Sequence, residues 1–266
     1  MPAIVVIPAR FGASRFPGKP FASLAGKPMI QHVYENAVRA KQVQSVFVAT
    51  DSEQIAEAVR AFGGSAIMTS DAHLSGTDRI AEAVQTIMAG GMFLGADDLV
   101  VNVQGDEPLL NSAMIDEVIS VMNDPKAEIG TLVKRIDKAE DLFNPNVVKA
   151  VFRHDGYALY FSRSPIPYHR ELFERGGTTF SDEQLAEVAM YKHYGIYAYR
   201  RGTLERFAKM PPTPLEQTEK LEQLRALEQN ITIKVGITDY NTIGVDTPED
   251  LERARQWLSI SSSPAE

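Results

Sequence analysis

Apolar residues in the first half of the chain fall into short continuous runs that alternate with stretches of helical periodicity. The runs predict buried strands at residues 4–7, 45–50, 66–68 and 98–103. Between them, apolar residues three and four positions apart predict helices that open near residue 27, after Ser52 and at residues 80–88. Strands that alternate with helices indicate an α/β fold with a mostly parallel sheet and covering helices.

The second half has shorter strands joined by tight turns. Strand-like runs lie at residues 130–133, 147–152, 157–161, 194–199 and 231–235. His154-Asp155-Gly156 predicts a hairpin turn, and the polar and aromatic residues 165–189 predict an excursion from the sheet. Helices are predicted at residues 203–208 and 217–229.

The last helix opens at Gly244-Val245-Asp246-Thr247-Pro248-Glu249-Asp250. Thr247 suits the N-cap, Pro248 the first helical position and Asp250 the capping-box position. We find no internal repeat and no low-complexity linker, so we expect one domain over residues 1–258. The small polar residues 259–266 predict a flexible tail.

Composition and charge narrow the function classes. The net charge of -8 argues against general nucleic-acid binding, which needs a basic face. The absence of cysteine excludes disulfides, thiolate metal sites and cysteine nucleophiles, and it fits a reducing cytoplasm. No apolar run approaches a membrane span and no signal-peptide pattern opens the chain, so we expect a cytoplasmic protein without membrane insertion.

A basic loop follows the first strand. It carries Arg10, Arg15 and Lys19 and no acid, and the first acidic residue of the protein is Glu35. The loop lacks the three glycines of a dinucleotide fingerprint and the Gly-Lys-Ser/Thr ending of a P-loop. Three side-chain cations could hold a triphosphate. The alternative is a surface loop whose cations pair with acids elsewhere.

Two aspartates predict a site for a hard divalent cation such as Mg²⁺. Asp106 follows a buried strand beside a glycine, at the strand end where parallel sheets bind ligands. Glu107 precedes Pro108 and is expected to turn away. Asp106 alone could simply begin a turn. Thr247 and Asp250 suffice to cap the last helix, so Asp246 has no capping role and could bind the same cation as Asp106. The sequence offers no rival His or Cys cluster.

Polar residues within otherwise buried runs suggest a second substrate site. They are Arg163, His193, Glu216 and Gln217, and each of them alone carries no assignment. We find no Ser-His-Asp order and no nucleophile elbow.

Several motifs together resemble the 3-deoxy-manno-octulosonate cytidylyltransferases, the CMP-Kdo synthetases of Gram-negative bacteria. The similarity extends to about residue 258. The motifs are Pro8-Ala9-Arg10, Ser14-Arg15-Phe16-Pro17-Gly18-Lys19-Pro20, Asn102-Val103-Gln104-Gly105-Asp106-Glu107-Pro108, Tyr157-Ala158-Leu159-Tyr160-Phe161-Ser162-Arg163, His193-Tyr194-Gly195-Ile196-Tyr197, Pro214-Leu215-Glu216 and Gly244-Val245-Asp246-Thr247-Pro248.

The resemblance implies a Rossmann-like nucleotidyltransferase fold in which residues of about 165–190 form a dimerisation excursion. It implies an enzyme that transfers CMP from CTP to the anomeric hydroxyl of 3-deoxy-D-manno-octulosonate (Kdo) with Mg²⁺, releases pyrophosphate and activates Kdo for lipopolysaccharide synthesis. The implied CTP site comprises Arg10, Ser14, Arg15, Lys19, Ser75, Thr77 and Arg79. The implied metal ligands are Asp106 and Asp246, which with Lys19 form the catalytic set. The implied sugar site comprises Gln104, Arg163, His193, Tyr197, Glu216 and Gln217.

Two rival interpretations remain open. One is a cytidylyltransferase for a related 2-keto sugar acid, such as 8-amino-Kdo or a sialic acid. The other is a catalytically silent nucleotide-binding subunit, which would be expected to lose Lys19, Asp106 or Asp246, and all three are present.

Overall fold

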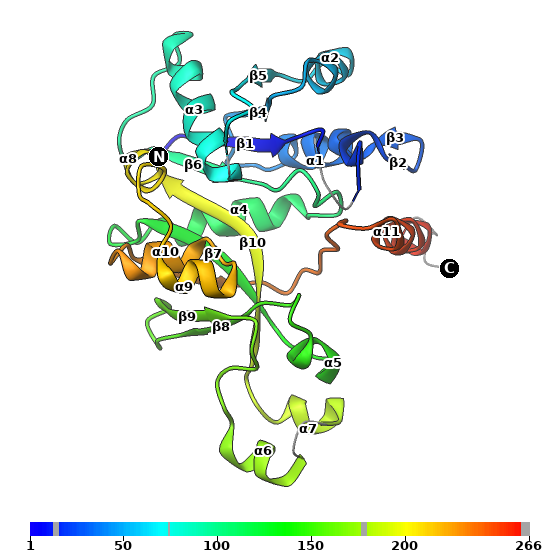
Figure 1. Ribbon diagram of the computed structural model, residues 1–266, viewed down its shortest axis with the longest axis vertical. Coiled ribbons are helices and arrows are strands. Elements are labelled where there is room, and N and C mark those ends of the chain that lie inside the picture. Colours follow the sequence, from blue (N-terminus) through cyan, green and yellow to red (C-terminus); the bar gives the residue numbers. More distant parts are fainter. Residues whose placement is uncertain (13–15, 74, 177–179, 262–266) are drawn as a thin grey trace. The chain divides into compact units, whose positions relative to one another are not determined.

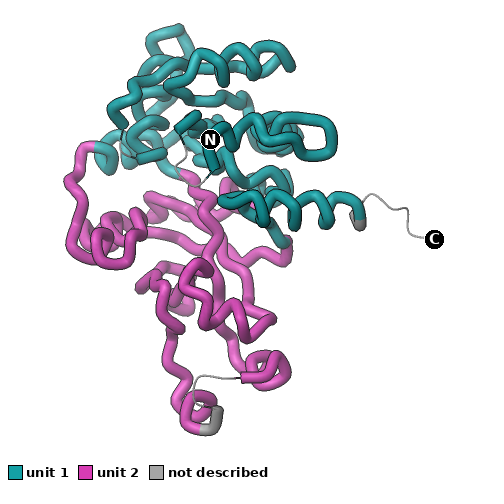
Figure 2. Tube along the Cα trace, turned by 45° about the vertical axis from the view of Figure 1, so that its right-hand side comes forward, with its two compact units in different colours: residues 1–116, 199–208, 241–266 teal, residues 117–198, 209–240 magenta. Residues whose placement is uncertain are grey.

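The computed structural model describes residues 1–12, 16–73, 75–176 and 180–261. The chain divides into two compact units (Figure 2). Unit 1 comprises Met1–Asp116, Tyr199–Ala208 and Asn241–Glu266, and unit 2 comprises Glu117–Ala198 and Lys209–Tyr240. The expected single domain over residues 1–258 remains a prediction.

Unit 1 contains a parallel sheet in the strand order β6-β1-β4-β5 (Figure 1). Its central strand, β1, is fully buried from Ala3 to Ile7, because β-branched side chains fill both faces of a covered sheet. The helices α1, α2 and α3 pack against these strands. The strands of unit 1 are β1 (Ala3–Ala9), β2 (Ser23–Leu24), β3 (Lys27–Pro28), β4 (Ser45–Thr50), β5 (Ala66–Met68) and β6 (Leu99–Asn102). Its helices are the 3-10 turn η1 (Lys19–Phe21), α1 (Met29–Val38), α2 (Glu53–Ala61), α3 (Gly76–Ala89), α8 (Arg201–Phe207) and α11 (Pro248–Ser261).

Unit 2 is a mixed sheet with short helices. β11 pairs with β7 in parallel, β7 neighbours β10, and β8 runs antiparallel to both β10 and β9. The strands of unit 2 are β7 (Ile129–Arg135), β8 (Lys149–Phe152), β9 (Ala158–Ser162), β10 (Tyr191–Arg200), whose last two residues belong to unit 1, and β11 (Ile233–Ile237). Its helices are α5 (Ala139–Phe143), α6 (Arg170–Gly176), α7 (Asp182–Ala186), α9 (Pro214–Glu219) and α10 (Gln223–Glu228), while α4 (Ser112–Val121) belongs to both units.

The predicted α/β class with a mostly parallel sheet is confirmed. Strands β4 and β5 have the predicted bounds, and Ser52 caps α2 by accepting a hydrogen bond from the Ile55 N–H. The predicted hairpin joins β8 to β9, with Gly156 at a φ of 82°. These elements follow from local signals, because a cap or a turn depends on residues only a few positions apart.

Two predicted helices differ from the structure. Helix α3 begins at Gly76 rather than near residue 80, because the side chain of Ser75 accepts a hydrogen bond from the Asp78 N–H and caps the earlier turn. The helix predicted at residues 217–229 is two helices, α9 and α10. They are separated at Lys220, whose φ of 55° ends α9.

The predicted excursion and the predicted tail agree more closely with the structure than these two helices do. Between β9 and β10 the described residues form no strand but carry α6 and α7, as an excursion from the sheet would. Helix α11 runs to Ser261, into the segment predicted as tail, and residues 262–266 lie outside the described chain. No helix within the described ranges combines the length and the apolar character needed to cross a bilayer.

Candidate active site

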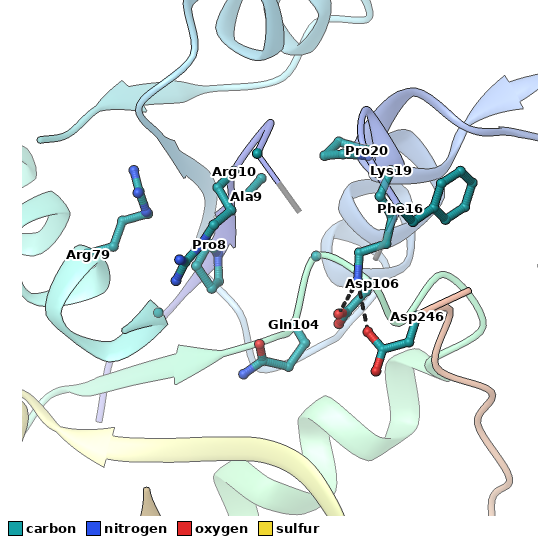
Figure 3. A pocket seen from close by; sticks show the side chains of 13 residues that line it. Pro8, Ala9, Arg10, Phe16, Lys19, Pro20, Arg79, Gln104, Asp106 and Asp246 are labelled. Atoms are coloured by element: carbon teal, nitrogen blue, oxygen red, sulfur yellow. Dashed lines mark hydrogen bonds and ion pairs between the residues drawn. The ribbon is translucent and has the colours of Figure 1, made fainter. Parts of the chain in front are cut away.

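A pocket of about 350 Å³ lies at the carboxyl ends of two neighbouring strands of unit 1, β1 and β6 (Figure 3). This is the edge where parallel sheets bind ligands. The lining combines the end of β1 with residues of four later segments. It consists of Pro8, Ala9, Arg10, Gly12, Phe16, Lys19, Pro20, Gly76, Arg79, Gln104, Gly105, Asp106 and Asp246.

Backbone contacts give the pocket floor its shape. A Cβ atom at Gly105 would lie 2.7 Å from the carbonyl oxygen of Pro8, so only glycine lets the loop after β6 approach the end of β1 this closely. The loop after β1 folds back on itself, because the N–H of Gly18 donates to the Phe11 carbonyl over 3.3 Å. Lys19 follows directly and begins the 3-10 turn η1.

Lys19 joins the two predicted metal ligands. Its Nζ donates to Oδ2 of Asp106 at 2.7 Å and to Oδ1 of Asp246 at 3.1 Å (Figure 3). Burial opposes the charge of the ammonium group, but the two carboxylates outweigh it and raise the pKa of Lys19 above its usual value. Residues separated by 87 and 227 positions in sequence therefore form one charged cluster.

The backbone holds the two aspartates together. The N–H of Val245 donates to the carbonyl oxygen of Asp106 at 2.8 Å, which fastens the segment before α11 to the loop after β6. The capping interactions predicted for α11 are present, since Thr247 and Asp250 exchange hydrogen bonds between side chain and backbone. Asp250 also accepts from the N–H of Asp246, which leaves the carboxylate of Asp246 to face Lys19.

The two aspartates fit a magnesium ion. The described ranges hold no group of three or more His, Cys, Asp or Glu side chains that could bind a metal, so an ion here would have two protein ligands. Both carboxylates converge on a single cationic atom, Nζ of Lys19. Mg²⁺ commonly takes one or two carboxylates and completes its shell with water and phosphate oxygens.

Glu107 lies beside this cluster with a different environment. Its carboxylate accepts a hydrogen bond from Oγ1 of Thr242 at 2.6 Å. Burial, reinforced by the negative charges of Asp106 and Asp246, raises the pKa of Glu107 to about 7. The sequence pattern gave no sign of this shift.

Arg79 forms the opposite wall of the pocket (Figure 3). Its side chain is only 1% exposed, and its guanidinium donates to Oδ2 of Asp51 at 2.6 Å and to Oγ1 of Thr69 at 2.7 Å. Arg10, in contrast, is exposed and lies between the two ends of the pocket. Both arginines were predicted to contact the nucleotide, and the pocket brings them together with Lys19.

The other residues predicted to contact CTP are not among the described residues that line the pocket. Ser75 caps α3 and Thr77 is buried in its first turn, and the pocket lining contains neither of them although it contains Gly76 between them. Ser14 and Arg15 lie outside the described residues. Gln104, predicted for the sugar, lines the pocket, and its Nε2 donates to Oδ1 of Asn102 at 3.3 Å.

His193 of the predicted sugar site belongs to unit 2 and has a defined tautomer. The hydroxyl of Thr131 lies 2.8 Å from the carbonyl oxygen of Ile196, so its proton must point there. Oγ1 of Thr131 therefore accepts from Nε2–H of His193 at 2.9 Å. Burial lowers the pKa of His193 to about 3, so its ring is neutral near pH 7. Tyr197 packs against this ring at a centroid distance of 5.4 Å.

The remaining predicted sugar residues of unit 2 have structural partners. Arg163 donates from Nε to the Glu219 carbonyl at 2.7 Å and from its other nitrogens to the carbonyls of Pro145 and Lys220. These contacts use three of its five N–H donors.

Glu216 and Gln217 lie in the first turn of α9. Glu216 receives a bidentate ion pair from Arg225, at 2.8 and 2.5 Å, and also accepts from the N–H of Thr213. Nε2 of Gln217 lies 3.5 Å from the Pro212 carbonyl.

The sequence pattern did not indicate two residues that contact the predicted site residues. Asp51 ends a predicted strand, but its partner Arg79 lies 28 positions later, and Thr131 is an apolar-run residue 62 positions before His193. A buried Thr or Arg within an apolar stretch is the available signal, because such groups need a partner when buried.

Comparison with known proteins first defines the class. The sequence model of the family described as "Cytidylyltransferase" matches residues 4–233. A solved 4-diphosphocytidyl-2C-methyl-D-erythritol synthase, 14% identical, covers 97% of this chain and 100% of its own with a TM-score of 0.63. This distant likeness shows the shared nucleotidyltransferase fold.

Nearer relatives define the family. The 3-deoxy-manno-octulosonate cytidylyltransferase of Thermodesulfovibrio yellowstonii is 55% identical over 98% of this chain and 100% of its own length. That of Geobacter sulfurreducens is 52% identical over 95% and 98%. A solved CMP:2-keto-3-deoxy-manno-octonic acid synthetase complexed with CTP is 41% identical, covers 98% of this chain and all of its own, and has a TM-score of 0.85. The chain belongs to the 3-deoxy-manno-octulosonate cytidylyltransferase family, which confirms the resemblance.

Proposed function

We propose that this protein transfers CMP from CTP to the anomeric hydroxyl of Kdo, releases pyrophosphate and so activates Kdo for lipopolysaccharide synthesis. The observation that carries the proposal is the convergence of Lys19, Asp106 and Asp246 in one pocket. It occurs in a chain that is 55% identical over its length to a 3-deoxy-manno-octulosonate cytidylyltransferase. The fold alone would leave the substrates open, because one fold hosts many activities.

In this proposal Asp106 and Asp246 hold Mg²⁺. When bound, the ion supplies positive charge to the triphosphate and can lower the pKa of a hydroxyl group. Lys19 and Arg10, together with Ser14 and Arg15 of the same loop, contact the triphosphate, and the loop cations stabilise the leaving pyrophosphate. Ser75 and Thr77 contact the nucleotide through the first turn of α3, beside Arg79.

The residues proposed for the sugar include Gln104, which lines the pocket of unit 1. Arg163 has two N–H donors beyond its three carbonyl contacts, which suits a carboxylate such as that of Kdo. The neutral ring of His193 suits the hydroxyl groups of a sugar better than an anion. The other three residues of this set are Tyr197, Glu216 and Gln217.

The reaction needs positioning more than acid–base chemistry. The anomeric hydroxyl loses its proton to solvent water and attacks the α-phosphorus in line. Its oxygen forms the new P–O bond, and the bond to pyrophosphate breaks on the opposite side. The protein supplies orientation and charge, as in other phosphoryl and nucleotidyl transfers, and no protein nucleophile takes part.

A substrate screen tests the proposal. The protein is incubated with Mg²⁺, each nucleoside triphosphate in turn and a panel of 2-keto sugar acids that includes Kdo, 8-amino-Kdo and a sialic acid. We expect pyrophosphate release with CTP and Kdo. Faster turnover of another sugar acid would overturn the choice of Kdo, and failure with every acid would overturn the enzyme assignment.

Variants of the metal ligands test the site. Asp106→Ala and Asp246→Ala should each abolish turnover while the far-UV circular dichroism stays unchanged. The matched control is Asp97→Ala, because the Asp97 side chain is 82% exposed on the same unit. Near-normal turnover by either Asp106→Ala or Asp246→Ala would remove the metal assignment.

Two further proposals concern the assembly of the protein and its location in the cell. We propose a homodimer formed through residues 165–190, as the family resemblance implies. Light scattering of the protein should then give twice the mass of one chain, and a monomer mass would refute the dimer. We propose a cytoplasmic location, which the absence of cysteine fits, and cell fractionation tests it.

A further inference from the structure

Arg79 is a fully buried arginine whose side chain nevertheless lines the pocket (Figure 3). A buried guanidinium is costly unless it is paired and hydrogen-bonded. Its NH2 group donates to Oδ2 of Asp51 at 2.6 Å, and its NH1 group donates to Oγ1 of Thr69 at 2.7 Å. Within the described residues, two of its five N–H donors are therefore fixed to the protein, and three remain for a ligand.

The two acceptors come from different elements than the arginine. Asp51 follows β4 directly, Thr69 follows β5, and Arg79 lies in the first turns of α3. The N–H of Thr69 donates to the carbonyl oxygen of Thr50 at 2.9 Å, so the two acceptor segments are themselves joined. The guanidinium is therefore held by two side chains that follow the paired strands β4 and β5.

Within the described residues, the Asp51 carboxylate makes its hydrogen bond to Arg79 and to no other side chain. Its side chain is 19% exposed, against 1% for Arg79. Asp51 has no capping task, because Ser52 caps α2. Fixing Arg79 is thus the one structural task that the described contacts give to Asp51.

The ion pair also changes what Arg79 offers to a ligand. Because Asp51 balances its charge, Arg79 contributes directed N–H donors rather than net positive charge. Lys19, Asp106 and Asp246 lie at the other end of the pocket (Figure 3). The charged parts of a nucleotide and its metal suit that end, and the uncharged nucleoside suits the Arg79 end.

We propose that Asp51 is a positioning residue that fixes the guanidinium of Arg79 against the nucleoside part of CTP, with Thr69 as the second fixing contact. The inference rests on the proposed function, because it takes CTP as the ligand of the pocket. Asp51 does not touch the nucleotide and acts through Arg79.

Steady-state kinetics with separate KM values for the two substrates tests the proposal. Asp51→Asn removes the charge and keeps the shape of the side chain. We expect its KM for CTP to rise about tenfold, because a charge-assisted hydrogen bond that orients a contact residue is lost. The KM for Kdo and kcat should stay within about twofold. Asp51→Glu restores the charge and should recover part of the affinity for CTP.

The matched control is Asp97→Asn, since Asp97 also forms an arginine pair on unit 1, at 3.6 Å to Arg200, but is exposed. It should leave both KM values unchanged. A purely structural role for Asp51 would lower the melting temperature of Asp51→Asn and leave its KM for CTP unchanged well below that temperature, and this result would overturn the inference.

Two further arms keep the outcomes separate. If Asp51→Asn does not fold, Thr69→Val removes the milder contact from the same guanidinium and should raise the KM for CTP about threefold. An unchanged KM in a folded Thr69→Val variant would then overturn the inference. If the wild-type protein releases no pyrophosphate from CTP and Kdo, the proposed function fails. If the wild type is active and Asp51→Asn matches it, only the present inference fails.

Discussion

The ammonium group of Lys19 occupies the place between the two carboxylates that a metal ion would need. It lies 2.7 Å from Asp106 and 3.1 Å from Asp246. A divalent cation that binds these carboxylates must therefore compete with Lys19. We expect Lys19→Met, which keeps the length of the side chain and removes its charge, to bind a divalent cation more tightly than the wild-type protein does.

The size of the effect follows from the exposure of the two ion pairs. The side chains of Asp106 and Asp246 are 34% and 49% exposed, so water screens both pairs. Partly exposed pairs of this kind contribute about 0.5 to 1 kcal/mol each. Without Lys19, a cation no longer has to break the two ion pairs, and its binding free energy becomes more favourable by about 1 to 2 kcal/mol. This difference corresponds to about five- to thirtyfold tighter binding of the cation.

The assay uses Mn²⁺ as a paramagnetic substitute for Mg²⁺, without nucleotide. Electron paramagnetic resonance measures free Mn²⁺ during titration of the wild-type protein and Lys19→Met. Lys27→Met is the matched control, because it removes the same charge from unit 1 but breaks a pair with Glu35 at 2.7 Å. Its affinity for Mn²⁺ should equal that of the wild-type protein.

Equal or weaker Mn²⁺ binding by Lys19→Met would refute the reasoning. It would mean either that the cation binds elsewhere or that Lys19 does not compete for the carboxylates. Comparison of Lys19→Met with Lys19→Met/Asp106→Asn separates these cases, because loss of the Asp106 carboxylate should weaken Mn²⁺ binding only if Asp106 is a ligand.

Three further predictions concern protonation and packing. The folded pKa of Glu107, about 7, lies above the ordinary 4.5, so ionisation of this carboxyl group lowers the free energy of unfolding as pH rises from about 4.5 to 7. Between pH 5 and pH 8, the free energy of unfolding measured in urea should therefore fall by about 1 to 3 kcal/mol less in Glu107→Gln than in the wild-type protein. Equal decreases in the two proteins would contradict this prediction. The folded pKa of His193, about 3, lies below 6.5, so its contribution to stability is lost as pH falls below 6.5, and its ¹⁵N resonances should remain those of a neutral ring down to pH 5. A midpoint near 6.5 would show that the ring is solvated. Gly105→Ala places a Cβ 2.7 Å from the Pro8 carbonyl and should destabilise the fold by about 2 kcal/mol, whereas Gly12→Ala has open space and should cost far less; equal unfolding midpoints in urea would disprove the clash.

Elements that depend on neighbouring residues could be predicted from the sequence. Strand β4 and the Ser52 cap are examples, because burial pattern and capping chemistry act within a few positions. The break at Lys220 could not be predicted, since Leu221, Leu224 and Leu227 keep a helical spacing from the very next residue onward. Its cause is distant in sequence: Arg163 donates to the carbonyls of Glu219 and Lys220 and so satisfies the end of α9.

The same limit applies to the site. The residue types and their positions after strands pointed to Asp106, Asp246 and Lys19, but not to the ammonium bridge between them, because pairing across 227 positions leaves no local pattern. Asp51 went unnoticed for the same reason. An acidic residue at the end of a strand predicts only a turn, and its role becomes visible only when the structure shows the buried arginine that it pairs with.

The charges of the pocket explain why nucleotide and metal should bind together. Three cationic side chains and three carboxylates lie in or directly against the described pocket: Arg10, Lys19, Arg79, Asp51, Asp106 and Asp246. Because their charges balance, this set has no surplus for a triphosphate. A divalent cation between the carboxylates would add positive charge and release Lys19, whose ammonium then becomes available to phosphate oxygens. The lysine predicted for the triphosphate and the aspartates predicted for the metal are thus two states of one charge cluster, and neither assignment excludes the other.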